Sequence, residues 1–183
     1  RVLFRSGREL AGIHFAMDYL TQANRLCAGD QVPEAERISA TGKHVVIIGG
    51  GDTGADCLGT ATRQGAASIH QLELLPKPPD ARAADNPWPQ WPNVYRVSSA
   101  HEEAGERRYA VSTERFIGEG GRVTALQTPS VTVTRENGRM AVTPVPGSTT
   151  ELKADLVLLA MGFVGPDRGP LLDELRVGLT ERG

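Results

Sequence analysis

The stretch KHVVIIGGGDTGADCLGTATRQGAASIHQLE, residues 43–73, decides the fold of this chain. Apolar residues 44–48 predict a strand, small residues from about 53 to 64 predict a helix, and residues from about 68 to 74 predict a second strand. Three glycines between the first strand and the helix have the spacing G-x-G-x-x-G. Because this pattern follows one strand and opens one helix, it predicts a β-α-β unit that binds a dinucleotide.

The three glycines have separate roles in this interpretation. Gly49 takes the positive φ of a sharp turn, and Gly51 lets backbone amides approach a pyrophosphate closely. Gly54 lets the helix pack tightly on the sheet, while the helix N-terminus directs free N–H groups at the anion. The turn lacks the Gly-Lys-Ser/Thr ending of a nucleoside triphosphatase loop, which excludes that class of site.

Composition narrows the class of protein. The 183 residues include 20 Lys and Arg and 22 Asp and Glu, for a formal net charge of −2. With no long charged block, this balance predicts neither a nucleic acid nor a membrane as partner. No apolar run approaches ~18 residues, so we expect a cytoplasmic protein. Two cysteines are too few for a zinc site or an iron–sulfur cluster, and Cys57 is predicted to pack as a small apolar group.

Two segments flank the β-α-β unit. Residues 10–27 have apolar positions at helical spacing and predict one helix, with His14 satisfied in a helix–helix contact. The loop Pro76–Pro92 is rich in proline and contains two tryptophans. Because it leaves the carboxyl end of the second strand, we expect it at the rim of the cofactor site.

The second half of the chain changes to a β pattern. Residues 94–97 predict a short strand and residues 101–106 a helical turn. Alternating runs within residues 108–146 predict an antiparallel meander, with turns at Gly120-Gly121 and Asn137-Gly138.

The chain then returns to the parallel sheet. Residues 154–162, ADLVLLAMG, predict a strand covered on both faces, and residues 171–175 predict a short helix. The expected fold is therefore an α/β, Rossmann-like NAD(P)-binding domain. It has a parallel sheet and an antiparallel β-meander crossover, as in flavoproteins with two dinucleotide-binding domains.

Three long runs resemble one family closely. GGGDTGADCLGTATRQGA (49–66), QLELLPKPPDARAADNPWPQWP (71–92) and ADLVLLAMGFVGP (154–166) resemble the small (beta) subunit of glutamate synthase. They also resemble the corresponding region of single-chain pyridine-nucleotide-dependent glutamate synthases. The likeness covers residues 7–183.

The resemblance implies a reductase in which an NAD(P)H-binding domain is inserted into an FAD-binding domain. Hydride passes from NAD(P)H to FAD, and electrons pass through iron–sulfur clusters outside this chain to the large (alpha) subunit or domain. There glutamine and 2-oxoglutarate yield glutamate. On this division, residues 1–42 are a stub of the FAD domain with a connector helix, 43–162 are the NAD(P)H-binding domain, and 163–183 begin the return. We expect the chain alone to be inactive.

The resemblance also implies a set of cofactor-binding residues. Those at the pyrophosphate are Gly49, Gly50, Gly51, Asp52, Thr53 and Gly54, and those near the nicotinamide are Ala160, Met161 and Gly162. Asp52 and Thr53 are equally well explained as helix-capping residues, and Gly162 as a turn glycine. No catalytic side chain and no metal ligand is assigned, because hydride transfer is the chemistry of the cofactors.

Glu73 predicts a preference for NADH over NADPH. It lies 19 residues after Gly54, where a carboxylate can bind the ribose 2′-hydroxyl and would repel a 2′-phosphate. In NADPH-preferring relatives two arginines follow the second strand, whereas this chain has Leu74 and Leu75. Lys77 and Arg82 on the next loop could still reach a phosphate.

Two alternatives remain open from the sequence. The first is the NAD(P)H domain of another FAD-dependent reductase, and the second is a nucleotide-binding scaffold without turnover. A methyltransferase also uses glycine-rich β-α-β turns, but the meander and the final apolar strand disfavour it.

Overall fold

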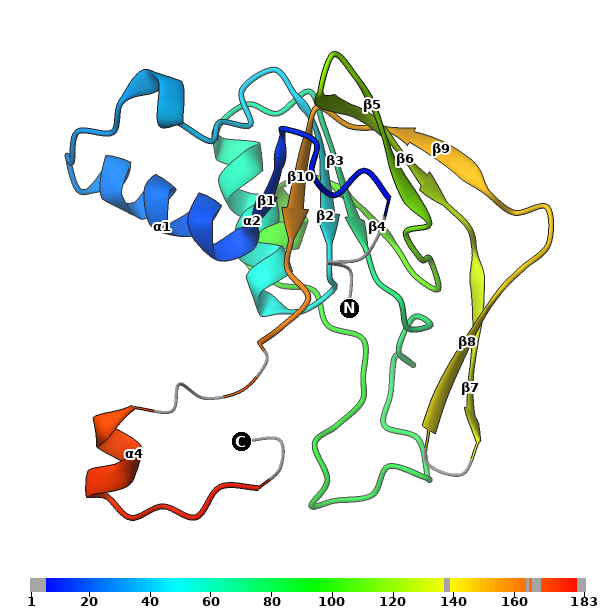
Figure 1. Cartoon of the computed structure of the whole chain (residues 1–183). Coiled ribbons are helices and arrows are strands. Elements are labelled where there is room, and N and C mark those ends of the chain that lie inside the picture. Colours follow the sequence, from blue (N-terminus) through cyan, green and yellow to red (C-terminus); the bar gives the residue numbers. More distant parts are fainter. Residues whose placement is uncertain (1–5, 137–138, 164, 166–168, 181–183) are drawn as a thin grey trace.

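The computed structural model describes residues 6–136, 139–163, 165 and 169–180. Its centre is a five-stranded parallel sheet in the order β1-β10-β2-β3-β4. Helices α1 and α2 cover one face, and an antiparallel sheet in the order β5-β6-β9 covers the other (Figure 1). The predicted α/β fold with a parallel sheet and an antiparallel meander is confirmed.

The elements have the following bounds. The parallel strands are β1 (Ile13–Phe15), β2 (His44–Ile48), β3 (Ser68–Leu72), β4 (Glu106–Arg108) and β10 (Leu156–Leu159). The antiparallel strands are β5 (Arg115–Glu119), β6 (Arg122–Thr128) and β9 (Thr150–Lys153), with a separate pair β7 (Val131–Glu136) and β8 (Arg139–Pro144). The helices are α1 (Ala16–Cys27), α2 (Asp52–Arg63), α3 (Ser99–Glu103) and α4 (Pro170–Glu174), with a 3₁₀ turn at Glu34–Glu36.

The central strand β2 is buried on both faces. Val45 and Ile47 pack in the core beneath the helices, while Val46 and Ile48 pack in the core beneath the antiparallel sheet. A β-branched run of this kind suits a parallel strand with partners on both sides. The strand therefore delivers the glycine turn from a rigid base.

The start of α2 differs in detail from the sequence-based expectation. Gly51 is the N-cap, Asp52 is the first helical residue, and no side chain caps the helix. The explanation of Asp52 and Thr53 as capping residues is therefore wrong. Asp52 still places a negative charge at the positive end of the helix dipole.

The segment before β2 begins with a short strand that the sequence did not predict. The helix predicted over residues 10–27 begins only at Ala16, because residues 13–15 form β1 and pair with β10. His14 consequently lies on a strand. Strand β1 and helix α1 share the sheet and core of the residues that follow. The domain boundary at residue 42 stays a prediction. The assignment of the flanking residues to an FAD domain stays a prediction.

The segment after β3 was also predicted incorrectly. Residues 94–97 form no strand, and the parallel edge strand is the charged β4 instead. The expected helical turn appears as α3, whose first turn is closed by a capping box between Ser98 and His101. An edge strand pairs with a neighbour on one side only and often carries charged side chains. Strand β4 therefore lacks the apolar pattern that would indicate a strand in the sequence.

The meander is confirmed in outline. Gly120 and Gly121 connect β5 to β6, and β7 pairs with β8 in the expected antiparallel sense. The predicted turn at Asn137-Gly138 lies outside the described residues. The run treated as one strand divides at Pro129 into β6 and β7, which belong to different sheets, and β9 was not predicted.

The remaining elements agree with expectation apart from their lengths. Strand β3 ends at Leu72 rather than at about residue 74, and β10 covers only four residues of the predicted 154–162. Helix α4 occupies the predicted place. Among the described residues, no helix is long and apolar enough to cross a membrane.

Candidate functional site

Two cavities meet at the glycine turn. The larger has a volume of about 1030 Å³ and the smaller about 470 Å³, and both are lined by Gly50, Gly51 and Glu73. They lie at the carboxyl ends of β2 and β3. Strand β2 has β3 on one side and β10 on the other, so the strand order switches direction at β2. Ligands of open α/β sheets bind at such a switch point.

Two of the turn glycines are required by the protein itself. Gly49 has φ 131°, and a side chain there would run into the carbonyl oxygen of Ala160. A side chain on Gly54 would run into the carbonyl oxygen of Gly49 and the amide of Gln71. The third glycine of the motif therefore makes room for the turn's own carbonyl group and a buried side chain.

Gly51 has no such explanation within the protein. Its φ is −83°, which any residue can adopt, and a Cβ there would meet no atom within 4 Å. The space beside it opens into both cavities at the N-terminus of α2. Free N–H groups and the positive end of the helix dipole make that space suited to an anion.

Glu73 points at the turn. Its carboxylate accepts a hydrogen bond from the N–H of Gly50 at 2.9 Å and another from the N–H of Leu75 at 2.9 Å. Each carboxylate oxygen can accept more than one bond, so the group can still bind a ribose hydroxyl. Its backbone N–H bonds to Arg108 of β4, which holds the residue at the sheet edge.

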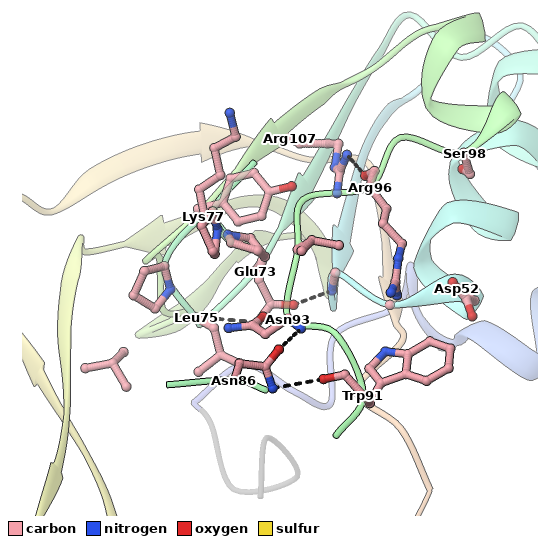
Figure 2. A pocket seen from close by; sticks show the side chains of 18 of the residues that line it. Asp52, Glu73, Leu75, Lys77, Asn86, Trp91, Asn93, Arg96, Ser98 and Arg107 are labelled. Atoms are coloured by element: carbon pink, nitrogen blue, oxygen red, sulfur yellow. Dashed lines mark hydrogen bonds between the residues drawn. The ribbon is translucent and has the colours of Figure 1, made fainter. Parts of the chain in front are cut away.

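The larger cavity carries three cationic side chains (Figure 2). The guanidinium of Arg107 lies 5.0 Å from the ring centroid of Tyr95, and that of Arg96 lies 4.8 Å from the ring of Trp91. Lys77 Nζ lies 4.1 Å from the same Tyr95 ring and 3.7 Å from a carboxylate oxygen of Asp80. Within the part of the chain that the structure describes, neither arginine has an ion-pair partner.

The proline-rich loop forms the rim of this cavity, as its position after β3 predicted. Arg82 does not line the cavity. Its guanidinium donates to the carbonyl oxygens of Asn86 at 3.0 Å and Gln90 at 3.1 Å, and so it closes the loop on itself. Lys77 is the member of the predicted pair that faces the site.

The smaller cavity is mainly apolar. Its walls come from the ends of β2, β3 and β10 and from the segment before β5; the lining residues beyond the shared turn include Ile48, Leu72, Leu74, Val111, Thr113, Ala160, Met161 and Gly162. Thr113 is 5% exposed, and its hydroxyl oxygen has no hydrogen-bond partner among the described residues. An unpaired buried hydroxyl is costly, so it marks a place where a ligand group can bind.

The structure brings together most of the predicted site residues. Those that line a cavity are Gly49, Gly50, Gly51, Asp52, Glu73, Ala160, Met161 and Gly162. Thr53 and Gly54 line neither. The sequence interpretation missed Arg96, Arg107, His101 and Thr113, which stand on loops, a short helix and an edge strand without a recognisable motif.

Neither cysteine contributes to the site. Cys57 is fully buried in α2, where burial raises the pKa of its thiol to about 12, so it remains protonated. Its predicted role as a small apolar group is confirmed. Among the described residues, no group of three or more His, Cys, Asp or Glu side chains could hold a metal ion.

Comparison with known proteins gives a family. No protein-family model matches the chain. The glutamate synthase [NADPH] small chain of Mycobacterium tuberculosis strain H37Rv is 58% identical over 180 residues, which cover 97% of this chain. This chain is homologous to a segment of the glutamate synthase small chain. The family resemblance predicted from the sequence is confirmed.

Other glutamate synthases match at lower identity. The NADH-type enzyme of Saccharomyces cerevisiae is 46% identical over 88% of this chain, and the NADPH-type small chain of Bacillus subtilis is 40% identical over 97%. The chain spans 36% of the length of the mycobacterial relative, 37% of the Bacillus relative and 8% of the yeast relative.

Solved structures agree with the fold. FprA of Mycobacterium tuberculosis in complex with NADPH has a TM-score of 0.60 at 15% identity, over 93% of this chain and 49% of that one. A FAD-dependent pyridine nucleotide-disulphide oxidoreductase of Desulfovibrio vulgaris has a TM-score of 0.53 at 20% identity, over 98% of this chain and 37% of that one. The chain therefore has the fold of the matched parts of these two proteins.

Proposed function

We propose that this chain binds the nicotinamide dinucleotide of a glutamate synthase-type reductase and presents it to FAD held by a longer protein. The observation that carries the proposal is the open space beside Gly51. It joins two cavities of different character at the N-terminus of a helix. A dinucleotide has the matching form, with two unlike ends joined by a pyrophosphate.

The two cavities divide the cofactor between them. The pyrophosphate lies at Gly51 and the first N–H groups of α2. The adenosine end occupies the larger cavity, with Glu73 at its border and Arg96 and Arg107 in its wall. The nicotinamide occupies the smaller, apolar cavity beside Ala160 and Gly162.

The chemistry follows from this division. Nicotinamide and flavin supply hydride transfer when both are bound, and the protein contributes position and electrostatics. The apolar walls of the smaller cavity, such as Ile48 and Val111, keep water from the reacting end. No general acid or base of this chain is needed for that step.

The wider role rests on the family. We propose that the electrons leave FAD through iron–sulfur clusters outside this chain and reach a large glutamate synthase subunit or domain. There glutamine and 2-oxoglutarate would give glutamate. The 58% identity to a protein named as a small chain supports this assignment.

NADH is the nucleotide that Glu73 favours. Its carboxylate stands at the border of the larger cavity, and its two bonds to backbone N–H groups hold it there. A negative charge fixed in this place binds a ribose 2′-hydroxyl and repels a 2′-phosphate.

NADPH is a second candidate, supported by Arg96 and Arg107. Both line the same cavity, and the structure gives neither a carboxylate partner among the described residues. Arginine binds a phosphate bidentately. Stacking of Arg107 on Tyr95 and of Arg96 on Trp91 holds the two guanidinium groups in place.

The experiment that tests the proposal uses the full-length flavoprotein. NADH and NADPH are titrated separately under anaerobic conditions, and flavin reduction is followed by its absorbance. The proposal requires saturable reduction by at least one nucleotide. Binding without reduction would favour a scaffold, and binding of neither nucleotide would refute the proposal. The Glu73→Gln variant should improve the use of NADPH if Glu73 sets the preference.

A further inference from the structure

Gln71 is a buried polar residue next to the site. It is the fourth residue of β3, its side chain is 1% exposed, and it lies on the same face of the strand as Ile69. A polar side chain in such a core must have hydrogen-bond partners, because leaving it unpaired is costly. Its partners identify its role.

Gln71 and Glu73 hold one peptide group of the glycine turn. The Nε2 of Gln71 donates to the carbonyl oxygen of Gly49 at 2.9 Å, and the N–H of Gly50 donates to Oε2 of Glu73 at 2.9 Å. These two backbone groups belong to the same planar peptide and point in opposite directions. The side chain of Gln71 in β3 and that of Glu73, just past the end of β3, therefore fix the orientation of the Gly49–Gly50 peptide.

His101 completes the arrangement from the other side. Its Nε2 lies 2.9 Å from Oε1 of Gln71, and its Nδ1 accepts a bond from the N–H of Ser98 at 3.2 Å. A backbone N–H can only donate, so Nδ1 is unprotonated and Nε2 carries the proton. His101 consequently donates to Gln71, and the amide nitrogen of Gln71 is left to donate to Gly49.

Helix α3 keeps His101 in place. Its Ala100 packs where Gly59 of α2 leaves room, and its Glu103 forms an ion pair with Arg63 of α2. His101 also lines the larger cavity, whose rim continues from Ser98 into the proline-rich loop. The hydrogen bonds thus join the wall of the adenosine cavity to the glycine turn.

We propose that Gln71 and His101 are positioning residues for the nucleotide pyrophosphate. They hold the Gly49–Gly50 peptide so that the first N–H groups of α2 remain directed at the phosphates. The inference rests on the proposed nucleotide-binding function. Neither residue touches the reacting atoms, so their effect is on nucleotide affinity rather than on hydride transfer.

The test measures binding and chemistry separately in the full-length flavoprotein. The dissociation constants of NADH and NADPH and the limiting rate of flavin reduction are determined for Gln71→Met, which keeps the shape and removes both hydrogen bonds. We expect the dissociation constant to rise about tenfold, as for the loss of a buried hydrogen bond. The limiting rate should change less than about twofold, because the chemical step is untouched.

Three His101 variants test the relay, which is the pair of hydrogen bonds from His101 to Gln71 and from Gln71 to Gly49. His101→Phe should weaken nucleotide binding, while His101→Gln, which retains an N–H donor, should bind as the native protein does. The Gln71→Met/His101→Phe double variant should be no weaker than Gln71→Met, because His101 acts through Gln71. His70→Gln is the matched control, since His70 lies on the same strand and lines neither cavity.

The outcomes separate this inference from the proposed function. If the native protein binds neither nucleotide, the proposed function fails. If the native protein binds and both Gln71→Met and His101→Phe bind equally well, the positioning role is refuted. Independent, multiplying effects of the two substitutions would also refute the relay. If Gln71→Met loses its FAD or no longer shows a thermal unfolding transition, the two His101 variants decide whether the positioning role holds. Weaker nucleotide binding by His101→Phe than by His101→Gln would support it, and equal binding would refute it.

Discussion

The two cavities beside the glycine turn differ in almost everything except their shared border. The larger has ionisable and aromatic side chains, among them Lys77 and Arg107, and its rim is a long proline-rich loop (Figure 2). The smaller has mainly aliphatic walls built from strand ends. For the proposed nucleotide-binding function, the contrast implies that the turn sets where a dinucleotide would cross the sheet, while the residues around it would decide which end lies in which cavity.

The largest expected effect concerns the border itself. Gly51→Val should weaken nucleotide binding more than about a hundredfold, because the side chain fills the space left for the pyrophosphate. The free energy of unfolding should fall by less than about 1 kcal/mol, since Gly51 has an ordinary φ and no close neighbour. Calorimetric titration and urea unfolding measure the two effects.

Gly49→Val is the control for that experiment. This side chain meets the carbonyl oxygen of Ala160 and requires a positive φ, so it should destabilise the fold by about 3 kcal/mol or more. Equal loss of stability in both variants would contradict the assignment of Gly51 to the ligand.

The next effect belongs to the larger cavity alone. Arg107→Gln should raise the dissociation constant of NADPH about tenfold if the guanidinium binds the 2′-phosphate, with little change for NADH. Arg108→Gln is the matched control, because Arg108 is paired with Glu106 and lines neither cavity. An equal change for both nucleotides would show that Arg107 does not read the phosphate.

A smaller effect belongs to the apolar cavity. Thr113→Val removes a buried hydroxyl without a hydrogen-bond partner, so the nucleotide-free protein should gain about 1 kcal/mol of stability. Thr128→Val should lose stability instead, because the hydroxyl of Thr128 bonds to Thr150. Urea unfolding of the two variants should therefore give changes of opposite sign.

The smallest expected effect is a dependence of folding stability on pH, to which three histidines contribute. Burial lowers the pKa of His14, His70 and His101 below 6.5 in the folded chain. The unfolded chain then binds protons more readily, so stability is fully present above pH 6.5 and falls as the pH drops below it. Thermal melts between pH 8 and 5.5 should show a falling midpoint, and His70→Gln should reduce the slope. A flat profile would contradict this linkage.

The sequence predicted those parts of the fold that are marked by strong local patterns. Strand β2 and helix α2 were predicted within a residue or two, because a β-branched run and a glycine turn leave few alternatives. Strand β1 was missed because three residues cannot establish a period, and Ile13 fits the helical spacing of α1. Strand β4 was missed because its residues are charged.

The candidate site was predictable along the turn and largely hidden elsewhere. Gly49, Gly51 and Glu73 stand in a recognisable order in the sequence, whereas Arg107 and Thr113 reach the cavities only through tertiary contacts. One signal was available and went unused. Gln71 alternates with Ile69 on one face of β3, and a polar residue on the buried face of a strand indicates a specific partner.

The place of β10 has a consequence for how the chain folds. It lies between β1 and β2, and its register pairs Leu156 with Val45, 111 residues earlier (Figure 1). During synthesis β1 and β2 therefore leave the ribosome long before the strand that joins them. Until then their inner edges expose unpaired backbone groups, which is the state in which strands associate wrongly. Loop closure over such a separation is slow. The unfilled position between β1 and β2 is therefore where a chaperone has the longest time to act.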